Sequence, residues 1–238
     1  LFEHHTTSLV FNDPPLHTRV RRLIMGALTR RAIAGMEPGL VLLVDELLDE
    51  MDARGGGDLI EDFASAIPVE IIGNLLDVPH GDRGPLRAWS LAILGALEPT
   101  LTPQQQAGGN QAVTEMTDYL RTLVAARRQR PGDPERDVLT RLIQGEEQGE
   151  QLSEVELLQN CIFLLNAGHE TTTNLIGNAL VALLEHPAVR ERLLQRLGGE
   201  DEVAVLDRAV DEFLRYESSN QLGNRRAAVG FGRTAMDD

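Results

Sequence analysis

The sequence of 238 residues has one cysteine, no lysine and few aromatic residues, which make up 4% of the chain. A single cysteine excludes an internal disulfide framework and favours a cytoplasmic protein. Basic residues are also scarce: the sequence has 22 arginines and 37 acidic residues, so the formal net charge is −15. A charge of this sign argues against nucleic acid and against an anionic membrane as partners.

Apolar residues fill most of the stretch from Leu152 to Glu185, on every side of the helix that it would form. A helix that is apolar all round belongs in the interior of a larger protein. Ser153 and Glu156 have the spacing of a capping box, which marks a helix start. Pro187 marks the end, because proline disfavours helical geometry in the residue before it. We therefore predict a long central helix over about residues 152–185.

The centre of this predicted helix is polar, with Asn166, Gly168, His169, Glu170 and three threonines. A glycine within a helix costs about 1 kcal/mol relative to alanine, and buried polar groups cost more unless they are paired. The polar centre is either a patch that bonds to a neighbouring helix or a functional site. A zinc motif H-E-x-x-H is excluded, because Thr173 stands at the second histidine position. The polar centre also argues against a membrane span.

The order Ala167-Gly168-x-Glu170-Thr171-Thr172 resembles the oxygen-binding motif in the long central helix of cytochromes P450. In that family the small Ala-Gly pair lets haem and dioxygen approach the helix, and the acid–alcohol pair relays protons. The resemblance implies that Glu170 and Thr171 are catalytic and that Ala167 and Gly168 lie against the cofactor. A carboxyl and a hydroxyl beside a local break in helical bonding suit proton transfer in a dry site.

A second motif begins at Asp13-Pro14-Pro15, a turn whose prolines preset the first turn of a helix. His17 and Arg21 follow four residues apart, so they share one helix face and could bind a pair of carboxylates. An ordinary basic helix face is the alternative. The segment resembles the D-P-P-x-H-x-x-x-R signature of bacterial P450s, which implies that His17 and Arg21 bind the haem propionates.

A third motif lies in a helix predicted over about residues 205–216. Glu212 and Arg215 are three residues apart there and can form an ion pair. They resemble the E-x-x-R of the P450 family, which implies a buried pair that locks the core beneath the haem. Arg225 falls where the family places another arginine that binds a propionate.

The one cysteine, Cys161, lies in the central helix, and we interpret it as a small buried apolar residue. P450 chemistry requires a cysteine thiolate on the haem iron. Residues 229–236 weakly resemble the cysteine loop of the family, with Met236 in the place of the cysteine. We therefore assign no metal ligand, and we expect this chain alone to capture haem b only weakly through its propionates.

The remaining segments predict helices over about residues 29–54, 59–76, 85–97, 111–130 and 189–197, with a mobile connection over residues 98–110. No convincing strand pattern occurs before residue 220. The resemblance implies a mainly α fold, the helical portion of the P450 fold around its long central helix, with little strand. Residues 1–238 would form a single partial P450-like domain.

The resemblance also implies a function, that of a bacterial haem-thiolate monooxygenase hydroxylating a small organic substrate with electrons from a ferredoxin-type redox partner. As given, the chain is expected to be an inactive fragment of such an enzyme. The first alternative is a haem-free P450-like protein that acts as an interaction partner or scaffold. A further alternative is a helical binding module that keeps the substrate pocket without the chemistry.

Overall fold

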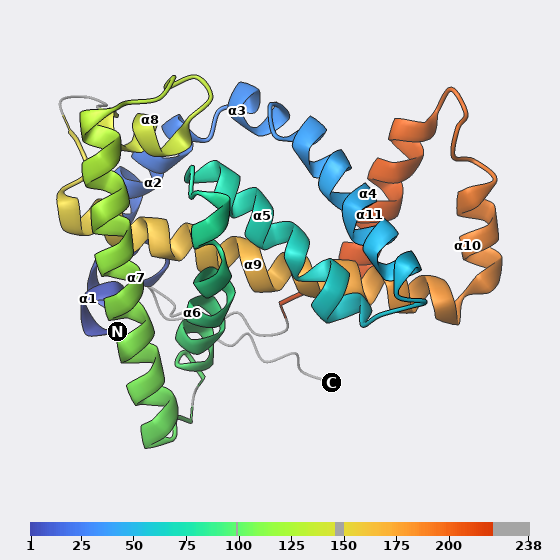
Figure 1. Cartoon of the computed structure of the whole chain (residues 1–238), viewed down its shortest axis with the longest axis horizontal. Coiled ribbons are helices and arrows are strands. Elements are labelled where there is room, and N and C mark those ends of the chain that lie inside the picture. Colours follow the sequence, from blue (N-terminus) through green and yellow to red (C-terminus); the bar gives the residue numbers. More distant parts are fainter. Residues whose placement is uncertain (99, 146–149, 221–238) are drawn as a thin grey trace, which may run out of the picture. The chain divides into compact units, whose positions relative to one another are not determined.

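The computed structural model describes residues 1–98, 100–145 and 150–220. The described residues form helices and no β-strand, which confirms the mainly α fold (Figure 1). The chain makes two compact units, residues 1–177 and 178–238, with the boundary inside the central helix. The single P450-like domain remains a prediction.

The first unit contains nine α-helices among its described residues. Their bounds are α1 Phe2–Thr7, α2 Leu16–Ala27, α3 Arg30–Ala34, α4 Glu37–Ala53, α5 Ala66–Leu75, α6 Gly84–Gly95, α7 Pro103–Gln129, α8 Val138–Gln144 and α9 Glu154–Glu185. Short helical turns cover Leu9–Phe11 and His80–Asp82, and a π-helical segment covers Leu59–Ala64. The second unit contains the end of α9 together with α10 Pro187–Leu194 and α11 Glu202–Tyr216.

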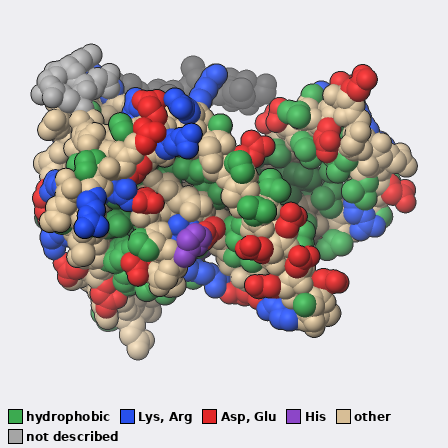
Figure 2. Space-filling model, turned by 45° about the horizontal axis from the view of Figure 1, so that its top comes forward, with side chains coloured by type: hydrophobic (Ala, Val, Ile, Leu, Met, Phe, Trp, Pro, Cys, Tyr) green, Lys and Arg blue, Asp and Glu red, His purple; other side chains and the backbone are tan. Residues whose placement is uncertain are grey.

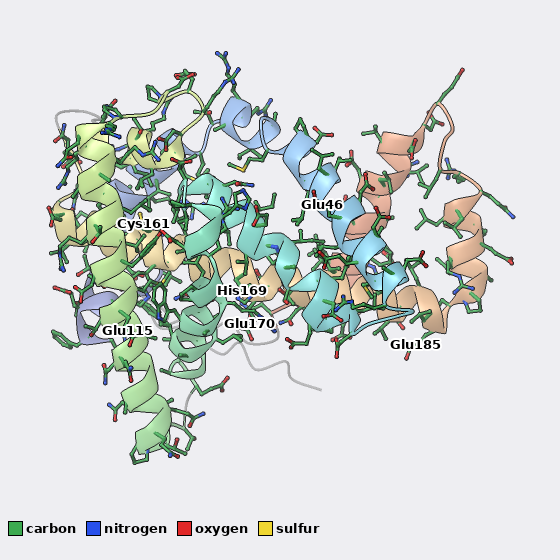
Figure 3. The ribbon with its side chains drawn as sticks, in the orientation of Figure 1. Glu46, Glu115, Cys161, His169, Glu170 and Glu185 are labelled. Carbon is green, nitrogen blue, oxygen red and sulfur yellow. The ribbon has the colours of Figure 1, made fainter. Side chains whose placement is uncertain are left out.

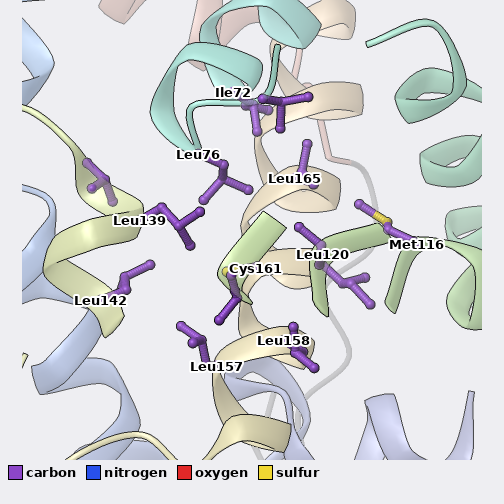
Figure 4. Close-up of a cluster of buried hydrophobic side chains, with 14 of the residues drawn as sticks. Ile72, Leu76, Met116, Leu120, Leu139, Leu142, Leu157, Leu158, Cys161 and Leu165 are labelled. Carbon is purple, nitrogen blue, oxygen red and sulfur yellow. The ribbon is translucent and has the colours of Figure 1, made fainter. Parts of the chain in front are cut away.

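The first half of α9 forms the middle of the hydrophobic core of the first unit. Its side chains pack with residues from the end of α5, from α7 and from α8 (Figure 4). Burying one such aliphatic side chain stabilises a fold by roughly 1.5–3 kcal/mol. The buried apolar residues of this part of α9 are Leu157, Leu158, Cys161, Ile162 and Leu165. The predicted interior position of the central helix is thus confirmed for this stretch.

Both predicted ends of α9 are confirmed to within two residues. At the start, the Ser153 amide donates to Glu156 Oε2 over 2.8 Å, and the Glu156 amide donates to Ser153 Oγ over 3.3 Å. This reciprocal pair is the predicted capping box. At the other end α9 stops at Glu185, and Pro187 begins α10.

The predicted connection over residues 98–110 is too long, because α7 already begins at Pro103. Thr102 and Gln105 form a second capping box in front of it. Gly109, interpreted as part of a loop, lies inside α7 where this helix approaches α6. A Cβ atom at Gly109 would lie 2.4 Å from Ala96 Cβ. The glycine therefore serves close helix packing and does not break the helix.

Two other predicted helices are divided in the structure. The segment over residues 29–54 breaks between Ala34 and Glu37, and the segment over residues 59–76 begins as the π-helical turn before α5. Asp58 caps that turn by accepting hydrogen bonds from the Ile60 and Glu61 amides. In the second unit, α11 begins at Glu202, three residues before the predicted start.

Candidate functional site

One face of α9 is open along the polar centre of the helix. Ala167, Glu170 and Asn174 are exposed there and Thr171 is half-buried. At about 100° per residue, these four positions lie within a sector of about 100° around the helix axis. Figure 3 shows where Cys161, His169 and Glu170 lie along the helix. We call the four residues Ala167, Glu170, Thr171 and Asn174 the open stripe.

The hydroxyl of Thr171 is fixed to the helix that carries it. Thr171 Oγ1 donates to the carbonyl oxygen of Ala167 over 2.8 Å. Such a bond to the carbonyl four residues earlier leaves the hydroxyl oxygen free to accept from another group. The expected break in helical bonding is absent, because α9 is continuous from Glu154 to Glu185. Thr171 therefore lies on a continuous helix, with its hydroxyl bonded to that helix.

Gly168 lies on one flank of the open stripe, where α5 packs against α9. A Cβ atom at Gly168 would lie 2.6 Å from Ile72 Cδ1. The glycine therefore lets α5 approach α9 closely. Its predicted place against the cofactor stays a prediction.

The other flank of the stripe faces α6 and is buried. His169 Nδ1 lies 3.2 Å from Ser90 Oγ. Burial, and to a smaller extent the nearby Arg87, lower the pKa of His169, so the ring is neutral at neutral pH. The polar centre was expected to be either a patch that bonds to a neighbouring helix or a functional site. His169 fits the first interpretation, because it bonds to α6. Glu170 lies on a different face of α9 and points outward, so it remains available for a functional site.

His17 and Arg21 lie on α2, whose apolar residues Val20, Leu23 and Ile24 are buried. His17 is half-buried and Arg21 is exposed. Between described residues, neither side chain shows a hydrogen bond or ion pair. The neighbouring Arg19 instead joins α2 to the start of α9 through an ion pair with Glu156.

The shared cavity predicted for His17, Arg21 and Arg225 stays a prediction. Between described residues, no hydrogen bond or ion pair joins His17 or Arg21 to Ala167 or Gly168. Arg225 and Met236 lie outside the described residues.

Cys161 is completely buried in the core, as predicted. Burial raises the pKa of its thiol to about 12, so the group stays protonated at neutral pH. Its position on α9 is also turned by about 120° from that of Ala167. Cys161 therefore cannot supply a thiolate on the side of the open stripe. Over the described ranges, no three potential ligand side chains gather in a metal-binding group.

The expectation of a buried Glu212–Arg215 pair is wrong for this structure. The two side chains form a bidentate ion pair, with Arg215 Nη2 donating to Glu212 Oε1 over 2.7 Å and Nε to Oε2 over 2.8 Å. Their exposed fractions are 58% for Glu212 and 69% for Arg215. The hydrogen bond from Arg215 lowers the pKa of Glu212. The pair forms locally on α11 and needs no burial.

A sequence model of the family described as Cytochrome P450 matches residues 90–229, which is more than half of this chain. The chain belongs to the cytochrome P450 family. It is 39% identical over 229 residues to Cytochrome P450 107B1 from Saccharopolyspora erythraea, covering 95% of this chain and 53% of the relative. It is 37% identical over 225 residues to the monooxygenase PikC from Streptomyces venezuelae, covering 93% of this chain and 50% of that enzyme.

Solved P450 structures resemble this chain as well. P450BioI in complex with an acyl carrier protein ligated to hexadec-9Z-enoic acid gives a TM-score of 0.77 at 32% identity, covering 90% of this chain and 52% of that protein. CYP109E1 from Bacillus megaterium in complex with testosterone gives 0.76 at 36% identity, covering 88% and 54%. The chain thus spans about half the length of the P450 relatives that it matches.

On the face shown in Figure 2, arginine side chains are interspersed with acidic ones instead of forming one basic patch. Among the described helices, none combines the length and the apolar character needed to cross a bilayer.

Sequence reasoning missed the residues of α6 that face the polar centre of α9. Arg87 and Ser90 are three residues apart and therefore share a face of α6. A polar pair in a mostly apolar helix was the available signal. It could not be matched to His169 without knowing which helices pack together.

Proposed function

We propose that this chain is the helical, oxygen-side half of a bacterial haem-thiolate monooxygenase. The whole enzyme would hydroxylate a small organic substrate with electrons from a ferredoxin-type redox partner. The observation that carries the proposal is the open stripe, since a P450 central helix here exposes a carboxylate and a small side chain directly after its most buried stretch.

The chain offers hydrogen-bond donors for the propionates at the edge of haem and a proton-carrying side chain for the face of the haem ring. His17, Arg21 and Arg225 would hold the propionates by charge-assisted hydrogen bonds. His17 and Arg21 suit this role, because between described residues both side chains are without a polar partner. When bound, haem supplies the oxygen activation.

The residues of the open stripe would divide the remaining work. Ala167 leaves room beside the helix. Glu170 takes a proton from solvent at its exposed carboxylate and passes it on. The Thr171 hydroxyl, held by the Ala167 carbonyl, accepts a hydrogen bond in that transfer.

The thiolate ligand has to come from polypeptide outside these 238 residues, because Cys161 is buried and protonated. We therefore expect the chain alone to be inactive as a monooxygenase, even with haem, electrons and oxygen. Thiolate ligation is what favours cleavage of the O–O bond in P450s.

The test is the spectrum of the reduced carbon monoxide complex. The purified chain is mixed with haem, reduced and exposed to carbon monoxide, and the same is done after co-expression with the C-terminal half of Cytochrome P450 107B1. We expect a thiolate-type Soret band only in the second sample. Glu170→Gln should leave this band unchanged and lower turnover, because the residue acts on protons and not on haem capture.

A thiolate-type band from the chain alone would refute the assignment of Cys161 if it disappeared with Cys161→Ser. If neither sample bound haem, the haem-free interaction protein would be favoured. One observation supports that second candidate, an exposed apolar stripe on α11 formed by Val203, Leu206, Val210 and Leu214.

A further inference from the structure

Three polar side-chain atoms of α9 are buried without a hydrogen-bond partner among the described residues. They are Oδ1 and Nδ2 of Asn166 and Nε2 of His169. Asn166 is only 5% exposed and His169 only 3%. The two residues are three apart and therefore neighbours on the helix surface. An amide with neither its donor nor its acceptor satisfied is rare in a folded interior.

The same helix shows what a satisfied buried amide looks like. Asn160 is 1% exposed, accepts a hydrogen bond from the Leu9 amide over 2.8 Å and donates to the Glu156 carbonyl over 2.7 Å. Gln159 is equally buried and lies 3.1 Å from His4 Nδ1. Two turns later Asn166 has no such partner. The difference points to a group that is absent from the chain itself.

Residues of α6 lie near the His169 ring. Ser90 Oγ lies 3.2 Å from His169 Nδ1 and so fixes the ring with Nε2 free. Arg87 stands one turn earlier on α6, and its Nε is also buried without a partner. The charge of Arg87 is balanced by Glu61, whose Oε2 lies 2.6 Å from Arg87 Nη1.

The electrostatics of this cluster select a neutral ligand group. Asn166 is uncharged, and the lowered pKa of His169 keeps its ring neutral. Because Arg87 is already paired with a carboxylate, an added anion would gain little. Asn166 offers one donor group and one acceptor, and His169 offers either, depending on its tautomer. A hydroxyl, which both donates and accepts, satisfies this set.

We propose that Asn166 and His169 bind a neutral hydroxyl group of the substrate between α6 and α9. On α9 they precede Glu170 by four residues and by one residue. Naming the bound molecule as the substrate rests on the proposed monooxygenase function. The binding of a hydroxyl does not rest on it. The site would let the enzyme distinguish an alcohol from a hydrocarbon of the same shape, because an analogue without the hydroxyl leaves the buried atoms unpaired.

The first experiment measures thermal unfolding of the chain without ligand. Asn166→Leu keeps the branching of the side chain and removes two unpaired polar atoms, so we expect Tm to rise by about 2–4 °C. The matched control, Asn160→Leu, removes satisfied bonds and should lower Tm. A fall in Tm for Asn166→Leu would show that Asn166 already has a partner in the free chain, and would overturn the proposal.

The second experiment measures binding with two probes, cyclohexanol and cyclohexane, added to the ¹⁵N-labelled chain. We expect cyclohexanol to shift the Asn166 side-chain amide and His169 imidazole signals saturably, and cyclohexane to leave them unchanged. Asn166→Leu should weaken cyclohexanol binding at least tenfold, as followed on His169.

Equal effects of both probes, no saturable shift, or unchanged cyclohexanol binding in Asn166→Leu would each overturn the proposal. Neither experiment uses haem. Failure here therefore leaves the carbon monoxide spectrum as an independent test of the proposed function, and failure of that spectrum leaves the hydroxyl site standing.

Discussion

Two consecutive stretches of α9 place similar side chains in opposite situations. In residues 157–165 every side chain faces the core or is partly covered, and the amides of Gln159 and Asn160 are hydrogen-bonded. In residues 166–174 one face is open, Glu170 points outward, and Asn166 is buried without a partner. The first stretch obeys the rules of a stable interior. The second departs from them at several positions, which is the pattern expected where function and stability compete.

The largest expected effect lies in the core stretch. Ile162→Ala removes a fully buried side chain and should lower the free energy of unfolding by about 2–5 kcal/mol. Val155→Ala, at a position that is 42% exposed near the start of the same helix, should change it by no more than about 0.5 kcal/mol. Urea denaturation of both variants provides the comparison. Similar losses at the two positions would contradict the burial described for α9.

Acidification should weaken the core stretch through His4, which pairs with Gln159. Burial lowers the pKa of His4 from 6.5 to about 4, so the unfolded chain takes up a proton before the folded chain does. The contribution of neutral His4 is therefore present above about pH 6.5 and lost as the pH falls towards 4. The shift corresponds to about 3 kcal/mol.

The measurement is the free energy of unfolding between pH 7 and pH 4. His4→Gln should give a flatter dependence than the wild type over this window. His186→Gln, at an exposed position, should follow the wild type. Parallel curves for wild type and His4→Gln would show that His4 does not titrate differently in the two states.

Asn160→Leu should have a smaller effect than these two changes. It leaves the buried Leu9 amide without an acceptor, which costs roughly 1–3 kcal/mol. Hydrogen exchange of the Leu9 amide checks the cause, because the lost bond should lower its protection specifically. Unchanged protection would mean that another acceptor replaces Asn160.

In the open stretch, Glu170→Gln should hardly affect stability. The side chain is exposed, so the free energy of unfolding should change by less than about 0.5 kcal/mol. In the complemented enzyme, turnover should fall by roughly 10²–10⁴-fold if Glu170 transfers protons. Glu170→Asp, which keeps the carboxyl group, is the matched control and should retain more activity.

The smallest effect is expected on α11. Because Glu212 and Arg215 pair on an exposed surface, Glu212→Ala should leave the midpoint of urea denaturation of this chain unchanged. If the same variant in the complemented protein prevented assembly, the pair would be part of a buried interface there. A clear loss of stability in the chain alone would contradict the exposed position.

Sequence patterns predicted the features that depend on residues close together in the sequence. The capping box at Ser153, the stop before Pro187 and the burial of Cys161 follow from local spacing and apolar surroundings. Predictions were wrong where the role of a residue depends on a contact with a segment distant in the sequence. Gly109 was interpreted as part of a loop, although it is needed where α6 approaches α7.

The candidate site shows the same division. Residue order brought out Glu170 and Thr171 as candidates, because both are polar in an apolar run. The missing partners of Asn166, the bond between His169 and Ser90 and the exposure of Glu212 depend on how helices pack, so a linear pattern could not reveal them.

The ion pair between Arg19 and Glu156 constrains the number of residues between Glu156 and Glu170. It ties α2, which carries His17 and Arg21, to a fixed point on α9, and Glu170 stands fourteen residues further along. At about 1.5 Å per residue this is a spacing of roughly 21 Å. One residue inserted between these points would turn Glu170 by about 100°. An insertion of four residues would nearly restore its direction, but would carry it about 6 Å along the axis. Among descendants of this sequence, substitutions in the segment should therefore accumulate far more readily than insertions or deletions.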